Sequence, residues 1–581
     1  MIRKYISIFC VSAMVLLFFS GCNTNLSETP TTTVPDTQST PDTSKMDFSF
    51  TDNDLDSSYD ESTSTKINIS ETYEITKAGT YILSGNLNNK TFTINAGKED
   101  KIKLVFNGIS ITNGNGPALY VKSAEKVFIT LAENSENTLS DGVDYSVTDE
   151  DATLDATLFS REDLTINGNG KLIVKGNYKH GIVSKDDLII TSGVIDVTSK
   201  NTSLCGKDCV KITKADITTN SGTDAIKSDN AEDATRGFVY IQSGNYNLTS
   251  TNDGIQAVTA INVADGTFKI SSGDDAIHSD NIFTFSKGTI DIIKCYEGIE
   301  ANHVTISGGN ISINASDDGI NATEPNDDET TDNKRPAQEE FSPTDSSITI
   351  SGGYTYIEAN GDGIDSNGSI NISGGVTLIS GPSSGPDTSF DYNGTATVTG
   401  GVFIGTSTGE MAQNFSEAKN QGAILYSFQA QQKENTTFSI CDENDKVIVS
   451  FDSPKPYSAV VVTAPQIKEG GKYKIVVGAE IENSDKHGYA NSSDKSGGTV
   501  LETIEMTSSL YGTSKGMPGG MAPGFNGGRP DGNFPDFDEM PSMPEGGFPQ
   551  MPDGNMPEMP DGKFPERPQG NPPEKPTITA K

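Results

Sequence analysis

The sequence has no tryptophan, only four histidines, and 42 basic residues against 80 acidic ones, which gives a net charge of -38. Without tryptophan, any ligand that stacks on an aromatic ring must use Tyr or Phe. An acidic excess of this size repels phosphate groups over the whole surface. The composition therefore argues against a nucleic acid partner and against binding to anionic lipid head groups.

Cysteine is scarce as well, with six residues, of which Cys10 and Cys22 lie at the amino terminus. The other four form no Cys-x-x-Cys pair, so neither a disulfide framework nor a zinc site is indicated. Cys205 and Cys209 are close enough in sequence to pair or to lie buried and free. We expect no structural disulfide.

The amino terminus has the pattern of an export signal. Arg3 and Lys4 precede an apolar run that ends at Phe19, which is short for a membrane span and suits a signal peptide. The residues before Cys22 resemble a bacterial lipobox, with Phe19 where that motif usually has Leu. We expect residues 1–22 to be a lipoprotein signal peptide with lipidation at Cys22, which would anchor the protein on the extracellular face of the cell membrane. The alternative is an ordinary signal peptide with a chance Cys.

A short repeat dominates the middle of the chain, where helical periodicity is nearly absent. An aliphatic residue in steps such as "DGI" and "DAI" marks each repeat, at Ile182, Leu204, Ile226, Ile255, Ile277, Ile299, Ile320 and Ile364. The intervals are 22, 22, 29, 22, 22, 21 and 44 residues. About 22 residues at about 3.3 Å each make a path of about 70 Å, which suits one coil of a three-sided parallel β-helix. Leucine-rich repeats share this period, but their Leu and Asn scaffold is missing.

These patterns divide the chain into five segments. Residues 23–46, rich in Ser, Thr and Pro, are expected to be a disordered linker, and residues 47–410 to form the β-helix. Residues 411–513 lose the period and contain hairpin-like strands such as "SAVVVTAP", which predicts a small antiparallel β unit that caps or flanks the helix. Residues 514–581, rich in Met, Pro and Gly, predict a disordered tail.

Alternation around the repeated aliphatic residue predicts which side chains face solvent. If the aliphatic residue and the small residue two positions later point inward, the residue between them points outward. This outward position is polar in six coils, and we take its members as candidates for contact with a carbohydrate: Lys227, Gln256, His278, Glu300, Asn321 and Asp365.

A second position, two residues before the aliphatic one, is acidic in six coils, and further carboxylates lie close to it. Since coils stack about 4.8 Å apart, such carboxylates repel one another unless they are fully hydrated or bind cations. Several carboxylates and turn carbonyls are the ligands that Ca²⁺ prefers, whereas Mg²⁺ demands stricter geometry. We predict bound Ca²⁺, with a hydrated acidic turn stack as the alternative. The candidate ligands are Asp224, Asp229, Asp253, Asp274, Asp275, Asp280, Glu297, Asp317, Asp318 and Asp362.

Several longer motifs resemble one family. "KVFITLAENSENTLSDG", "FSREDLTINGNGKLIVKGNYKHGIVSKDDLIITSG", "DDAIHSD" and "FDYNGTATVTGG" are similar to the carbohydrate-binding-domain-containing β-helix family of clostridial and related bacterial surface proteins, over roughly residues 47 to 510. The resemblance implies a right-handed parallel β-helix of pectate-lyase-like shape. It also implies bound calcium and affinity for plant cell-wall polysaccharides, including cellulose and acidic sugars such as polygalacturonate.

Catalysis is the main alternative to binding. "NDGI" followed 22 residues later by "DDAI" is similar to the acid pair of polygalacturonases, but the Gly-His-Gly-like and Arg-x-Lys-like steps of those enzymes are missing. A calcium-dependent lyase needs a base, for which Lys227 is the best candidate; as an ordinary solvated residue it would pair with neighbouring Asp residues. We expect a monomeric, non-catalytic carbohydrate-binding protein at the cell surface. A purely structural or adhesive surface protein is the third possibility.

Overall fold

The fold follows from a chain that alternates short β strands with tight turns and makes almost no helix. The computed structural model describes residues 42–71, 73–146, 148–149, 153–325 and 343–512. In this part of the chain no helix is long and apolar enough to cross a membrane. The helical segments described are the short 3₁₀ turn η1 (Thr43–Lys45) and α1 (Asp52–Leu55).

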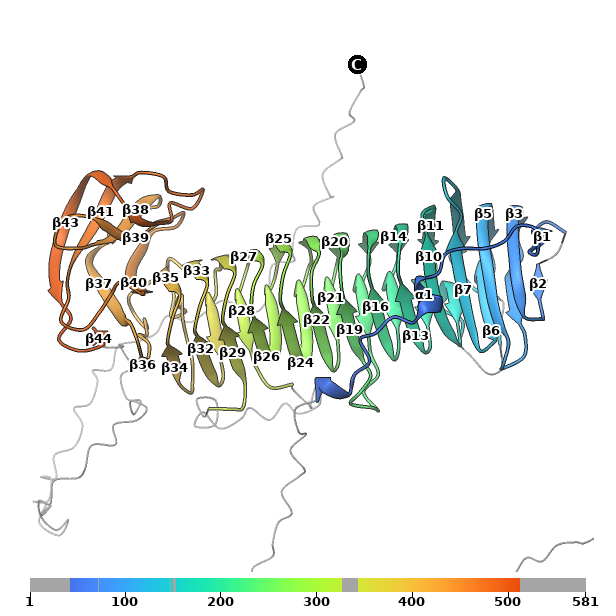
Figure 1. The fold of residues 1–581 in the computed structure, drawn as a ribbon, viewed down its shortest axis with the longest axis horizontal. Helices are drawn as coiled ribbons and strands as arrows, with labels where there is room; N and C mark the ends of the chain where they lie inside the picture. The colour runs from blue at the N-terminus through green and yellow to red at the C-terminus, as the bar shows by residue number, and fades with distance from the viewer. Residues whose placement is uncertain (1–41, 72, 147, 150–152, 326–342, 513–581) are drawn as a thin grey trace, which may run out of the picture. The chain divides into compact units, whose positions relative to one another are not determined.

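Parallel strands stack coil on coil in three columns (Figure 1). The first column contains β1 (Thr65–Asn68), β3 (Gly79–Asn88), β5 (Lys101–Asn113), β7 (Lys126–Leu131), β10 (Asp163–Gly168), β13 (Asp187–Ile190), β16 (Cys209–Ile212), β19 (Phe238–Ile241), β22 (Ala260–Val263), β24 (Ile277–Phe285), β26 (Ile299–Ile306), β29 (Ser347–Ile350), β32 (Ser369–Ile372), β34 (Ala396–Val398) and β36 (Glu417–Ala418). The second column continues from the ends of β3 and β5 with β8 (Glu136–Asp141), β11 (Lys171–Gly176), β14 (Gly193–Ser199), β17 (Ala215–Ser221), β20 (Gly244–Ser250), β23 (Thr267–Ser271), β25 (Thr289–Cys295), β27 (Asn310–Ala315), β30 (Tyr354–Glu358), β33 (Val376–Ser380) and β35 (Val402–Ser407).

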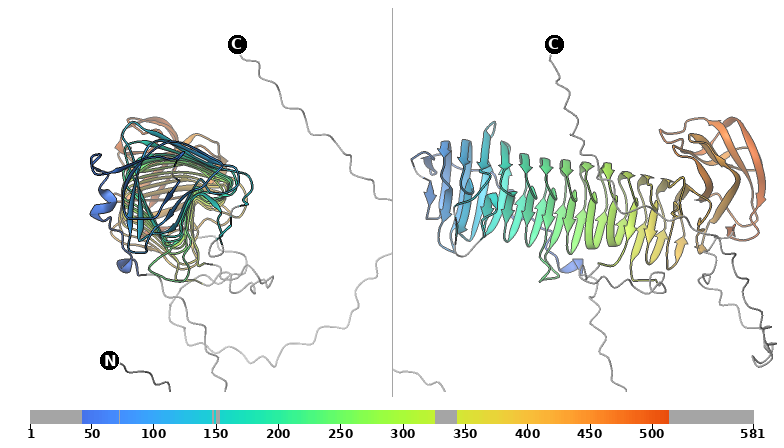
Figure 2. Two further views of the ribbon diagram at one scale, coloured as in Figure 1. Left: turned by 90° about the vertical axis from the view of Figure 1, so that its right-hand side faces the viewer. Right: turned by 180° about the vertical axis from the view of Figure 1, so that it is seen from behind.

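The third column positions the candidate site. It contains β2 (Glu74–Ile75), β4 (Phe92–Asn95), β6 (Leu119–Ser123), β9 (Ala156–Ser160), β12 (His180–Ser184), β15 (Leu204–Gly206), β18 (Ile226–Ser228), β21 (Ile255–Ala257), the first residues of β24 and β26, β28 (Ile320–Ala322) and β31 (Ile364–Ser366). Seen end-on, the coils superimpose (Figure 2). The three-sided parallel β-helix predicted from the period is confirmed.

The predicted core register is confirmed along the third column. Ile182 pairs with Leu204, Leu204 with Ile226, and the pairing continues through every marked residue to Ile364. All eight of these side chains are fully buried. Because strand side chains alternate in direction, this register places the intervening polar residue of each coil on the outer surface.

Glycines at the bends let consecutive coils approach closely. Gly353 has a φ of 84°, and a Cβ there would lie 2.6 Å from the carbonyl oxygen of Gly309 in the preceding coil. Gly375 repeats this arrangement one coil later. Only glycine allows this backbone conformation at this separation, which explains the recurrent "SGG" of the sequence.

Residues 422–512 form the predicted antiparallel β unit. Its strands are β37 (Gly422–Gln432), β38 (Thr436–Cys441), β39 (Val447–Ser453), β40 (Tyr457–Ala464), β41 (Lys472–Ile481), β42 (Ala490–Ser493), β43 (Lys495–Glu505) and β44 (Leu510–Tyr511). β40 pairs antiparallel with β35 of the last coil, so the unit continues the second column. The five strands β42, β39, β38, β41 and β43 form a separate sheet.

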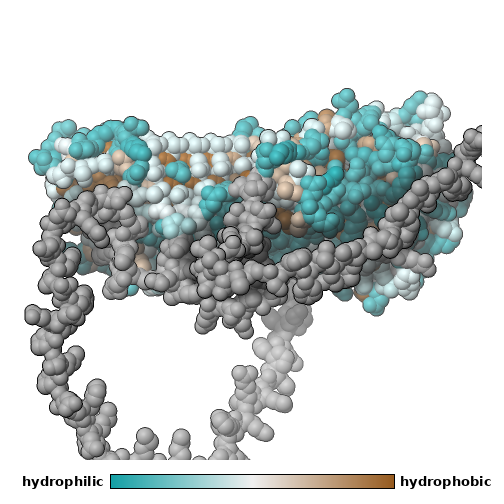
Figure 3. Space-filling view, turned by 90° about the horizontal axis from the view of Figure 1, so that it is seen from below, coloured by the Kyte–Doolittle hydropathy of each residue, from teal (hydrophilic) through white to brown (hydrophobic). Residues whose placement is uncertain are grey.

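The cysteines agree with the expectation of no disulfide: Cys205, Cys209, Cys295 and Cys441 are all free thiols. The surface drawn in Figure 3 is mostly hydrophilic or near-neutral, with hydrophobic residues in narrow strips. The predicted signal peptide, the lipidation site Cys22 and the tail 514–581 lie outside the described residues.

Residues 42–60 form a strap across the outside of the first column. Phe48 packs edge-on against Phe238, with ring centroids 5.2 Å apart, and Met46 is buried beside Cys209. Asp54 is fully buried; its carboxylate pairs with Lys126 at 2.8 Å and accepts a hydrogen bond from Thr165 at 2.6 Å. The strap therefore ties several successive coils together.

We expect Asp54→Ala to lower the free energy of unfolding by about 3 kcal/mol, because it leaves the ammonium group of Lys126 largely enclosed and without its partner. Urea unfolding followed by circular dichroism measures the change. Asp52→Ala, which removes an exposed carboxylate from the same helical turn, is the control and should change stability little. Equal midpoints for the two variants would show that the strap does not contribute to stability.

Candidate functional site

The candidate site is built from two rows of side chains along the third column. The turn row lies just before the strands and contains Asp224, Asp253, Asp275, Glu297, Asp318 and Asp362. The face row lies on the outer surface of the strands and contains Lys227, Gln256, His278, Glu300, Asn321 and Asp365. Within the face row each residue pairs in register with the next, so neighbours are about one strand spacing apart.

The turn row is much less hydrated than an exposed acidic turn stack would be. Asp224, Asp253 and Asp275 are only 3 to 5% exposed. Backbone N–H groups of the following coil stabilise several of these carboxylates: Asp275 donates to Asp253 at 3.2 Å, and Asp362 donates to Asp318 at 2.6 Å. The row therefore combines burial, hydrogen bonding and like charge.

His278 lies at the centre of the two rows. Its Nδ1 is 3.0 Å from Asp275 and 3.5 Å from Glu300, and its Nε2 is 3.3 Å from Asp280. The side chain faces outward as predicted but is only 27% exposed, because these three carboxylates enclose it. Although burial opposes its charge, hydrogen bonds to Asp275 and Asp280 raise the pKa of His278 to about 11.

Beyond His278 the negative charges have few positive partners. Burial and neighbouring carboxylates raise the pKa of Glu297 to about 8, of Asp318 to about 8 and of Asp362 to about 9. The same causes raise the pKa of Asp253 and of Asp365 to about 7. Near neutral pH these groups must retain protons or be neutralised by a cation. We name the stretch from Asp253 to Asp365 in the two rows the carboxylate run.

Two groups of ligand atoms in the carboxylate run are close enough to hold a metal ion. Asp253, Asp275 and His278 form one group, and Asp275, Glu297 and Glu300 form the other; within each group the ligand atoms lie within 4.8 Å of one another. Asp275 belongs to both groups. The second offers oxygen atoms alone, which is the donor set that Ca²⁺ prefers.

Two amide oxygens also fit a cation. Gln256 Oε1 and Asn321 Oδ1 are buried and have no hydrogen-bond partner among the described residues. Each belongs to the face row, Gln256 beside His278 and Asn321 beside Glu300. An amide oxygen is a further ligand of the kind found at calcium sites. The residues present therefore fit Ca²⁺, best around Glu297 and Glu300.

Some predicted ligands lie away from these groups. Asp229 and Asp274 are exposed, and Asp280 contacts His278 from the outside. Asp317 is hydrogen-bonded by Tyr296, which raises the pKa of that phenol to about 12. Asp224 lies at the lower end of the turn row, 3.4 Å from Lys227.

Asp391 extends the carboxylate run and was missed from the sequence. Its N–H donates to the carbonyl of Ile364, and burial raises the pKa of its carboxyl. Phe390 occupies the core position equivalent to Ile364 in the next coil, so alignment on Phe390 would have placed Asp391 beside Asp365. Glu300 was assigned to carbohydrate contact alone, since its contribution to the metal group depends on side-chain reach from the face row.

Among the tyrosines that could stack on a sugar, only Tyr296 has a largely open ring, at 47% exposure. Tyr356 is buried and stacks on His487 with centroids 3.5 Å apart, and Tyr392 is buried as well. Tyr354 donates a hydrogen bond to Asp485 of the C-terminal unit. Tyr296 follows directly on β25 beside Glu297, so its ring lies at the carboxylate run.

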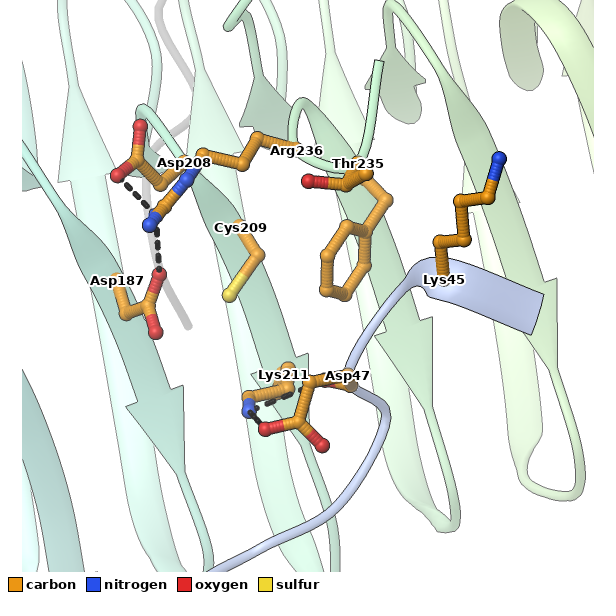
Figure 4. A pocket seen from close by; sticks show the side chains of 9 residues that line it. Lys45, Asp47, Asp187, Asp208, Cys209, Lys211, Thr235 and Arg236 are labelled. Atoms are coloured by element: carbon orange, nitrogen blue, oxygen red, sulfur yellow. Dashed lines mark hydrogen bonds and ion pairs between the residues drawn. The ribbon is translucent and has the colours of Figure 1, made fainter. Parts of the chain in front are cut away.

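A separate cavity of about 200 Å³ lies between the strap and the first column (Figure 4). Its charged groups are paired with one another: Arg236 with Asp208 and Asp187, and Lys211 with the strap residue Asp47. This internal balance indicates a role in holding the strap rather than in binding a ligand.

Comparison with known proteins places this arrangement among carbohydrate-binding β proteins. Residues 70–329 match the family described as carbohydrate-binding domain-containing protein, which confirms the resemblance seen in the sequence motifs. A protein of that description from Acetivibrio thermocellus is 43% identical over 125 residues, which is 21% of this chain. The match covers 44% of that relative, so the chain spans less than half of its length.

One solved structure is also similar. It is described as a polysaccharide lyase-like protein from C. thermocellum in a gadolinium derivative, and it is 35% identical to the part of this chain that it matches. The match covers 38% of this chain and 86% of that one, with a TM-score of 0.35.

Proposed function

We propose that the protein is a calcium-dependent binder of acidic plant cell-wall polysaccharide that does not cleave its ligand. The observation that carries the proposal is the carboxylate run, which concentrates negative charge in a half-buried row with few compensating cations. The family match supports a carbohydrate as the ligand, and the charge pattern supports a cation as the link to it.

Calcium explains how such an acidic chain could bind an acidic sugar. With a net charge of -38, direct contact between the protein and a polyuronate is repulsive. A cation held by Asp275, Glu297 and Glu300 reverses the local charge and has coordination positions to share with ligand carboxylates. Since the two rows continue from coil to coil, several sugar units could be held along one face.

The open ring of Tyr296 is suited to a sugar face next to the cation. Aromatic rings stack on the apolar face of a sugar and add to binding without selecting charge. Export and anchoring through lipidated Cys22, as the amino-terminal pattern indicates, would place this face outside the cell.

A calcium-dependent lyase is the second candidate function, since Lys227 lies in the face row next to the carboxylate run. In the structure its ammonium group is 3.4 Å from Asp224. The arrangement is that of an ion pair, so we favour a binding role for Lys227. Ultraviolet absorbance of unsaturated products distinguishes the two functions when polygalacturonate is incubated with the protein and calcium.

A polysaccharide pull-down with the full chain tests the proposal. Retention on insoluble polygalacturonate is expected in calcium, and most of the protein should be released by excess chelator. Cellulose, which has no carboxylates, is the matched ligand and should show no response to calcium. Retention on neither polysaccharide would instead support a structural or adhesive surface protein.

A further inference from the structure

We propose that Lys179, Lys185 and Lys227 form a second contact region on the third column, which binds ligand carboxylates directly and without calcium. This cationic patch deepens the proposed function and rests on it, because it assigns the same acidic polysaccharide to a longer surface. It would allow one polymer chain to contact lysines at one end of the site and calcium at the other.

The patch is continuous with the carboxylate run. Lys179 and Lys185 flank β12, and Lys227 stands in the face row two coils later, in register with Cys205 and Val183. Lys227 pairs in register with Gln256, where the carboxylate run begins. All three lysines act electrostatically on the ring of His180, so they surround one location.

Two of the three ammonium groups are free to accept a ligand. Among the described residues, Lys179 and Lys185 have no ion-pair partner, whereas Lys227 is shared with Asp224. Such lysines are unusual in a chain with 80 acidic residues and 42 basic ones. Because a carboxylate-bearing ligand complements this local charge, and a neutral sugar does not, the patch selects for acidic polysaccharide.

Aromatic rings position the lysine side chains. Lys179 Nζ is 5.4 Å from the ring centre of Tyr178, and Lys185 Nζ is 5.5 Å from that of Phe159. Cation–π contacts at these distances restrict the ammonium groups while leaving their N–H donors available. Tyr178 is itself fixed by stacking on Tyr145, with centroids 4.3 Å apart.

The floor of the patch contains unused polar atoms. His180 Nδ1 and Asp155 Oδ1 are both buried and have no hydrogen-bond partner among the described residues. The two residues are adjacent, because the N–H of His180 donates to the carbonyl of Asp155 at 2.9 Å. Buried polar atoms are nearly always paired, so atoms of this kind favour a site that receives water or a polar ligand.

Calorimetric titration of the full chain with polygalacturonate in excess chelator and low salt tests the patch. Weak residual binding is expected, and Lys179→Gln/Lys185→Gln should reduce it about tenfold, since each exposed ion pair contributes up to about fivefold. Lys269→Gln, an exposed lysine of β23 without an ion-pair partner in the described chain, is the matched control and should bind as the unmodified protein does. Added salt should weaken the residual binding.

Three outcomes would overturn the inference. Binding in calcium with none in chelator contradicts the patch and leaves the calcium-dependent function standing. Equal residual binding by the double variant and the Lys269→Gln control contradicts the patch in the same way. Absence of binding under both conditions contradicts the patch together with the proposed function.

Discussion

Calcium is expected to raise the melting temperature of the chelator-treated protein by about 5 to 10 °C. A ligand at about 100 times its Kd stabilises the folded state by about 2.7 kcal/mol, and 1 kcal/mol corresponds to about 2 to 4 °C in a domain of moderate size. The physical reason is that calcium relieves repulsion between carboxylates that the fold holds together, as at Glu297 and Glu300.

Asp275→Asn should abolish most of this gain, because Asp275 is common to both groups of ligand atoms. Asp291→Asn, which changes a carboxylate of β25 in the second column, is the matched control and should keep the full gain. Differential scanning calorimetry with and without calcium measures both. An equal gain in the two variants would place the bound calcium outside the carboxylate run. Magnesium should give a smaller gain, because it requires stricter geometry.

Without calcium, stability should fall as the pH rises from 5 to 8, with a loss of about 5 to 10 °C in melting temperature. Carboxyls titrate near pH 4 in the unfolded chain, but the pKa of Glu297 is raised to about 8 and that of Asp362 to about 9. Between these values the folded protein binds more protons than the unfolded one, so each further rise in pH favours unfolding. A few carboxyls suffice, since one pKa unit corresponds to about 1.4 kcal/mol.

His278 acts in the same direction. Its pKa is raised to about 11 in the folded protein, so its favourable contribution is fully present below about pH 6.5 and is lost as the pH rises towards 11. Saturating calcium should flatten or reverse the dependence on pH, because calcium binds the ionised carboxylates and takes over their stabilisation.

Melting curves at several pH values, with chelator and with calcium, check this expectation. Asp362→Asn should reduce the pH dependence in chelator, since it removes the carboxyl with the highest pKa in the carboxylate run. Asp216→Asn, an exposed carboxylate of β17, should leave the dependence unchanged. A melting temperature in chelator that rises between pH 5 and 8 would contradict the burial of uncompensated charge at this site.

The core of the fold was predictable because it repeats. The aliphatic residues from Ile182 to Ile364 occur in one position of each coil, so their spacing alone predicts the register that the strands adopt. The same alignment placed the turn row and the face row on the third column. Periodicity conveys this information because each coil stacks on an equivalent one.

Features that occur once were not predictable in this way. The enclosure of His278 by Asp275, Asp280 and Glu300 depends on side-chain reach, which the spacing of residues does not specify. The strap at Asp54 depends on contacts with residues more than 70 positions away, such as Lys126. The cationic patch depends on which lysines remain unpaired after folding, and a sequence does not indicate that.

The most direct test of the account is calorimetric titration of the full chain with polygalacturonate in calcium and in excess chelator, repeated with Asp275→Asn. The account predicts at least about tenfold tighter binding in calcium, a difference of about 1.4 kcal/mol, and loss of that difference in the variant. Equal affinity in calcium and in chelator would contradict the claim that the carboxylate run binds acidic polysaccharide through calcium.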